Sequence, residues 1–202
     1  ADKAESMLLA VHQGPRNLLG LAWLSVTQGQ LQLAECSPDD LEAWVVRIAP
    51  SELLYSAGIT AAFTQRLQNL RAGTGLTLTQ RPDWQFDPAL GQRKLLEQLQ
   101  AASLMTWSAE ALAQAHAAAG ALLQFAEHTQ GRALSHVQSL RVQRDDTLMD
   151  LPPATRRNLE LTRTLRGEES PTRFSLMDTS MSGMGSRLLK RWLQEPPRDR
   201  SV

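Results

Sequence analysis

The sequence contains little cysteine, little tyrosine and no excess of either charge. A lone cysteine, Cys36, cannot form an internal disulfide, and we expect it to be a small buried apolar residue in a reducing compartment. With 21 basic and 21 acidic side chains, the chain has no overall attraction for nucleic acid or for an anionic membrane. No apolar run reaches the roughly 18 residues that a membrane span needs. What is present is an ordinary globular composition, 42% hydrophobic over 202 residues, which is enough to bury a core.

Charge is unevenly distributed along this neutral chain. Residues 1–140 hold 9 basic and 12 acidic side chains, whereas residues 141–202 hold 12 basic and 9 acidic ones. A polar stretch at this change of composition leads into two prolines at 152–153, which interrupt any helix. We therefore predict one domain at residues 1–143 and the beginning of a second at 150–202. The missing initial methionine and the helical pattern near the end suggest a piece of a larger protein.

The beginning of the chain has the pattern of a strand meander. Apolar stretches at 7–11, 18–26 and 31–33 are separated by Gly-Pro and Gln-Gly turn signals. Three consecutive strands joined by such short turns are expected to be antiparallel neighbours.

The hydrophobic period then changes to that of helices. Helical stripes at 41–48 and 63–70, the second preceded by a cap at Thr60, alternate with short strands at 52–55 and 76–79. This alternation predicts an α/β fold, a mixed sheet flanked by helices.

Two further helices are predicted, the first beginning at Asp87 and the second capped by Ser108. The second is rich in alanine, and its small side chains should allow close packing against a neighbour. Residues 134–143 have the pattern of an exit strand or an extended segment. Beyond residue 150, helical pieces at 154–165 and 184–194 have too few apolar positions for a core of their own, so we expect them to pack on elements missing from this chain.

The sequence lacks the common motifs of catalytic and metal sites. The sequence has no GxxxxGK[ST] phosphate loop, no GxSxG nucleophile elbow, and no HExxH or cysteine pair for zinc. The element order resembles that of ribonuclease H-like domains, whose metal ions need several converging carboxylates. However, the first two strands contain no acid, and Asp39, Asp40 and Glu42 lie where carboxylates suit the start of a helix. We expect no catalytic residue, cofactor-binding residue or metal ligand here.

The histidines and the basic residues are weaker candidates. We expect His12 in a turn, His116 half-buried or exposed on the alanine-rich helix, and His128 and His136 exposed. Basic side chains gather on the two helical pieces of the second part, where they would contact phosphate or a neighbouring domain, or else form a solvated face. These basic side chains are Arg156, Arg157, Arg163, Arg187, Lys190 and Arg191.

Two strings in the second part resemble the bacterial MutS mismatch-repair family. They are ATRRNLEL at 154–161 and MGSRLLKRWLQEP at 184–196. Upstream, GLAWLSVTQGQLQLAE at 20–35, PSELLY at 50–55 and ALLQFAEHTQ at 121–130 are similar to further stretches of the same family. The resemblance therefore covers essentially the whole chain.

The resemblance implies that residues 1–143 form a connector domain, ribonuclease H-like but without nuclease activity, and that residues 150–202 begin the helical core, or lever, domain. The full-length family protein is a homodimeric clamp of the bacterial cytoplasm that binds mismatched double-stranded DNA, hydrolyses ATP with magnesium and recruits MutL. This fragment is then no enzyme and holds no cofactor. It is expected to couple the DNA clamp to the ATPase.

The resemblance also implies a MutL-docking face at the start of the helix at 89–99. The matching positions are Gln92, Arg93 and Lys94, where the family often has glutamines, so the basic pair is a departure. From the residues alone, the alternative is a plain solubilising face. Two other functions stay open as alternatives, a ribonuclease H-like nuclease and an autonomous DNA-binding module. The acid-free strands argue against the first, and the neutral net charge argues against the second.

Overall fold

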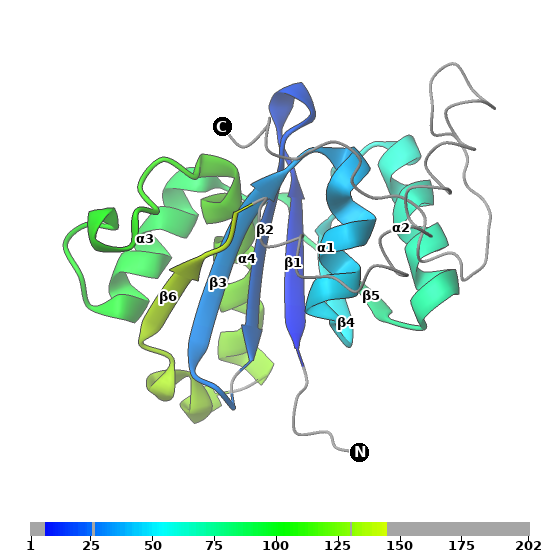
Figure 1. The fold of residues 1–202 in the computed structure, drawn as a ribbon. Helices are drawn as coiled ribbons and strands as arrows, with labels where there is room; N and C mark the ends of the chain where they lie inside the picture. Colours follow the sequence, from blue (N-terminus) through cyan, green and yellow to red (C-terminus); the bar gives the residue numbers. More distant parts are fainter. Residues whose placement is uncertain (1–6, 26, 130, 145–202) are drawn as a thin grey trace. The chain divides into compact units, whose positions relative to one another are not determined.

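The computed structural model of the chain describes residues 7–25, 27–129 and 131–144 (Figure 1). The predicted second domain and its arginine-rich pieces lie outside the described residues. The described part divides into two compact units. The first comprises the described residues of 1–35, 50–58 and 79–143, and the second those of 36–49, 59–78 and residue 144.

The core of the first unit is a six-stranded mixed sheet with the order β5-β4-β1-β2-β3-β6. β1 pairs antiparallel with β2 and parallel with β4, and β3 pairs parallel with β6. The predicted α/β class, with a mixed sheet and helices, is therefore confirmed, as is the meander of the first three strands. The strands are β1 (Leu8–Gln13), β2 (Leu19–Ser25), β3 (Gln30–Cys36), β4 (Glu52–Ser56), β5 (Thr77–Arg81) and β6 (Ser139–Val142).

The strand sequences explain their places in the sheet. β2 reads LGLAWLS, and all seven of its residues are buried, as expected of a central strand whose apolar run is continuous. β3 alternates instead, with Leu31 and Leu33 buried and Gln30 and Gln32 half-buried. Cys36 at the end of β3 is 2% exposed, which confirms its prediction as a buried residue.

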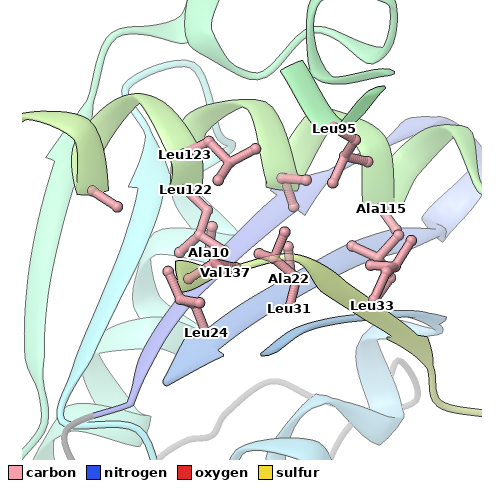
Figure 2. Close-up of a cluster of buried hydrophobic side chains, with 14 of the residues drawn as sticks. Ala10, Ala22, Leu24, Leu31, Leu33, Leu95, Ala115, Leu122, Leu123 and Val137 are labelled. Atoms are coloured by element: carbon pink, nitrogen blue, oxygen red, sulfur yellow. The ribbon is translucent and has the colours of Figure 1, made fainter. Parts of the chain in front are cut away.

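Two helices of the first unit, α3 (Pro88–Leu99) and α4 (Ala113–Thr129), pack against each other, and α4 lies against β1 and β2. Figure 2 shows this side of the sheet, where strand residues such as Leu24 and Leu31 meet Leu95, Leu122 and Leu123 of the helices. The apolar faces of these elements thus form one core.

Helix α4 approaches its neighbours closely, as its small residues predicted. A Cβ atom at Gly20 of β2 would lie 1.9 Å from the carbonyl oxygen of Gln114. A Cβ atom at Gly91 of α3 would lie 1.7 Å from the carbonyl oxygen of His116. Both distances are far below any real contact, so only glycine fits at these two crossings.

The second unit contains α1 (Leu41–Ile48) and α2 (Ala61–Thr74). The Oγ1 atom of Thr60 accepts a hydrogen bond from Phe63 N at 3.1 Å, which confirms the predicted cap of α2. Arg66 of α2 donates to the carbonyl oxygen of Pro38 and lies 3.8 Å from Asp39. No helix in the part of the chain that the structure describes is long and apolar enough to cross a membrane.

Three local predictions were wrong. Ser108 does not cap the long helix, because it adopts φ 57° after a 3-10 turn and α4 begins only at Ala113. His12 lies within β1 rather than in the following turn, since the chain turns only at Gly14 and Pro15. The exit strand is also shorter than predicted, because residues 131–136 form a 3-10 helix and only residues 139–142 are a strand.

Candidate functional site

The predicted docking residues lie on the first half of α3, and the structure separates them. Gln92 and Arg93 are exposed. The side chain of Lys94 is only 17% exposed, because its Nζ atom lies 3.1 Å from Oε2 of Glu127 on α4. Sequence reasoning missed Glu127, since no local pattern shows which residue of α4 faces Lys94.

The orientation of α3 follows from its buried side. Gly91, Leu95 and Leu99 are buried at helical spacing. Gly91 lies against Gly120 of α4, since a Cβ atom on Gly120 would be 3.0 Å from the Cα atom of Gly91. This backbone contact and the buried side of α3 set which face of the helix is turned outward, and Arg93 lies on the exposed face.

The nuclease alternative requires several acids to converge at the sheet, and polar groups do gather at the carboxyl ends of the parallel strands β1 and β4. His12 of β1 and Ser56 of β4 lie at the same edge of the sheet. Ser56 Oγ donates to Asp83 Oδ1 at 2.7 Å and accepts from Gly58 N at 2.9 Å. The second acid of this region, Asp87, accepts from the backbone at the start of α3. These groups are therefore engaged in turns and caps.

The acidic, histidine and cysteine side chains of the described residues are dispersed. Among them, no group of three or more His, Cys, Asp or Glu residues is placed to hold a metal ion. The acids at the start of α1 belong to the second unit, where Asp40 and Glu42 are 0% and 1% exposed. The described residues thus offer no set of carboxylates of the kind that two-metal hydrolysis requires.

His12 is held between α4 and the turn before α3. Its ring stacks on Phe86, with centroids 6.1 Å apart and an interplanar angle of 16°. Burial lowers the pKa of His12, while a hydrogen bond with Gln114 and the charges of Asp83 and Asp87 act in the opposite direction. At neutral pH the ring is therefore uncharged and serves as a packing element.

Glu35 anchors the beginning of α4 to the sheet. Its Oε2 atom accepts from Gln114 N at 2.8 Å and from Ala115 N at 3.3 Å. Burial raises the pKa of Glu35, and the two backbone hydrogen bonds partly offset this effect. Because the first N–H groups of a helix have no partner within it, this carboxylate replaces the cap predicted at Ser108.

His116 is a buried structural residue rather than a half-buried or exposed one. It is 4% exposed, and its Nε2 atom lies 2.7 Å from the carbonyl oxygen of Ala109, to which it donates. Burial lowers its pKa, against the raising effect of that hydrogen bond. The prediction was wrong because the loop before α4 folds back over the helix. His128 and His136 are exposed, as predicted.

Two protein-family models match the chain and identify its family, which the geometry alone does not reveal. The family model described as MutS domain II matches residues 6–138, which include nearly all of the described residues. The model described as MutS domain III matches residues 154–202, where the two recognisable strings lie. Together with the mixed sheet that domain II forms here, these matches show that the chain belongs to the MutS family of DNA mismatch-repair proteins.

Proposed function

We propose that this part of the protein is a non-catalytic connector that links the mismatched-DNA clamp to the ATPase and offers a docking face for MutL. The observation that carries the proposal is the presence of MutS domains II and III, in that order, in one chain. In the full-length protein, ATP and magnesium belong to a further domain, and mismatched DNA is bound by a homodimer in the bacterial cytoplasm. The fragment itself performs no chemistry.

The way in which α4 is held supports a mechanical role. Glu35 ties the first turn of α4 to β3, and Gly91 and Gly120 bring α3 and α4 into backbone contact. Interiors packed in this way transmit displacement instead of absorbing it. A force applied to α3 is therefore expected to move the sheet with it.

The exposed beginning of α3 supports the docking role. Arg93 is a charge presented from a helix of fixed orientation, with the amide of Gln92 beside it. Lys94 acts as a positioning residue through its ion pair with Glu127. Arginine is well suited to such a face because its guanidinium forms bidentate bonds with carboxylates.

The test is a binding titration of the full chain against the N-terminal domain of MutL. Arg93→Glu is expected to weaken binding about tenfold or more, since it reverses the charge at the contact. Arg71→Glu is the matched control, because Arg71 is an exposed arginine on α2. Equal loss of binding in the two variants, or none in Arg93→Glu, would exclude this face.

A further inference from the structure

The turn between β5 and α3 carries a large exposed aromatic side chain. Trp84 is 61% exposed, whereas the two residues that follow it, Gln85 and Phe86, are 4% and 5% exposed. The turn is a 3-10 helix, Asp83–Gln85. An exposed tryptophan next to buried residues is typical of recognition surfaces, where it combines large contact area with few rotatable bonds.

This turn is rigid. Arg81 Nε donates to Gln85 Oε1 at 3.1 Å, and its guanidinium carbon lies 5.3 Å from the centroid of the Phe125 ring. Phe86 stacks on His12 of β1. Trp84 is therefore presented by an ordered backbone, and a partner would bind it at little entropic cost.

The charge around Trp84 is negative. Asp83 and Asp87 are both exposed, and each uses one carboxylate oxygen, accepting from Ser56 Oγ and from Leu90 N. The nearest cation in sequence, Arg81, keeps its charge in its contacts with the neutral Gln85 and Phe125, so it offsets one of the two negative charges and leaves a net negative charge. His12 lies close to both acids and is uncharged at neutral pH, because burial lowers its pKa. The positive end of the α3 dipole offsets part of the charge of Asp87, which lies at the start of that helix.

We propose that Trp84, together with Asp83 and Asp87, forms a docking surface for an arginine- or lysine-rich segment of a partner protein. A cation placed over the indole face is attracted by the ring, and the flanking carboxylates add to this attraction. Charge decides the class of partner, because the same carboxylates repel the phosphates of a nucleic acid. This surface goes beyond the proposed function and does not depend on Arg93.

The experiment follows the indole N–H signals of the isotopically labelled full chain by NMR. The probe is an acetylated peptide of alternating glycine and arginine, and its matched control replaces each arginine by glutamate. Trp84→Phe assigns the Trp84 signal. We expect the arginine peptide to shift this signal saturably, and the signal of the half-buried Trp107 to stay in place.

Conservative variants then test the two carboxylates. Asp83→Asn and Asp87→Asn keep an oxygen for Ser56 Oγ and for Leu90 N, and asparagine is a good helix cap, so both variants should fold. Each is expected to weaken peptide binding about threefold, and Trp84→Ala about fivefold. Glu110→Gln, at an exposed acid near the start of α4, should leave the affinity unchanged.

Three results would overturn the proposal. The first is an unshifted Trp84 signal at millimolar arginine peptide. The second is an equal response to the glutamate peptide or to a short DNA duplex. The third is unchanged affinity in both asparagine variants, whose spectra report directly whether they are folded.

Discussion

Glu35 and Gln114 are 79 positions apart in sequence, and the carboxylate of one accepts a 2.8 Å hydrogen bond from the backbone N–H of the other. This contact joins the third strand of the sheet to the first turn of its longest helix. It places a negative charge at the positive end of the α4 dipole. The same helix carries Glu127, the partner of Lys94, so the proposed docking face and the sheet are held by one element.

Removing the carboxylate of Glu35 should loosen the beginning of α4. Glu35→Ala is expected to lower the free energy of unfolding by about 1–2 kcal/mol, since backbone N–H groups lose their acceptor. Glu35→Gln should cost less, because its amide oxygen still accepts. Urea denaturation of the three proteins measures this difference, and equal stability of the wild type and Glu35→Ala would show that water replaces the carboxylate at no cost.

The backbone contact between α3 and α4 should not tolerate a methyl group. Gly91→Ala is expected to destabilise the protein by about 3 kcal/mol, because the helices must separate to admit the Cβ atom. Gly75→Ala is the comparison. Gly75 has open space around it and φ +76°, so only backbone strain of about 1 kcal/mol is expected. Chemical denaturation measures the free energy of unfolding of both variants. A smaller loss of stability in Gly91→Ala than in Gly75→Ala would contradict the prediction.

The stability of the first unit should fall as the pH is lowered below the ordinary histidine pKa. Burial lowers the pKa of His12 and of His116, so below pH 6.5 the unfolded chain binds protons that the folded chain excludes. Stability from this source is thus present at neutral pH and is lost as the pH falls through the folded-state values. Glu35 acts in the opposite sense, since its raised pKa costs stability as the pH rises through the carboxyl range.

The measurement is the free energy of unfolding at pH 7.5 and at pH 5.5. His116→Gln keeps an amide donor for the carbonyl of Ala109 but cannot titrate, so its stability should change less between the two values than that of the wild type. His128→Gln, at an exposed histidine, is the matched control for the substitution itself. Identical pH dependence in all three proteins would assign the effect to other groups.

The ion pair between Lys94 and Glu127 should contribute little to stability. Glu127 is 46% exposed, so solvent screens the interaction, and a coupling energy of about 0.5 kcal/mol is expected from a double-mutant cycle with Lys94→Ala and Glu127→Ala. Because the packing of α3 on α4 already sets the orientation of the helix, the ion pair can position only the side chain of Lys94. Glu127→Ala should therefore weaken MutL binding by no more than about twofold, and unchanged binding would remove Lys94 from any positioning role.

The nuclease alternative has a direct test. We expect no magnesium-dependent cleavage of an RNA–DNA hybrid by the full chain, because the strand ends carry too few converging carboxylates for two-metal chemistry. Cleavage that requires magnesium and is lost in Asp83→Asn would revive the alternative.

Local patterns in the sequence determined most elements of the fold. The continuous apolar run of β2, the Thr60 and Asp87 caps and the Gly-Pro turn each depend on residues within a few positions of one another, so period and turn chemistry were sufficient to predict them. The alanines of α4 likewise predicted close packing, because small side chains leave room for a neighbouring backbone.

Only the tertiary structure decided which distant residues meet. Glu35 caps α4 in place of Ser108, Glu127 pairs with Lys94, and Trp84 stays exposed beside buried Phe86. None of these has a local signature, because each depends on the register of the strands and on the roll of a helix over the sheet. Hydrophobic period fixes which face of an element is buried, but the packing of whole elements selects the partner of each polar side chain.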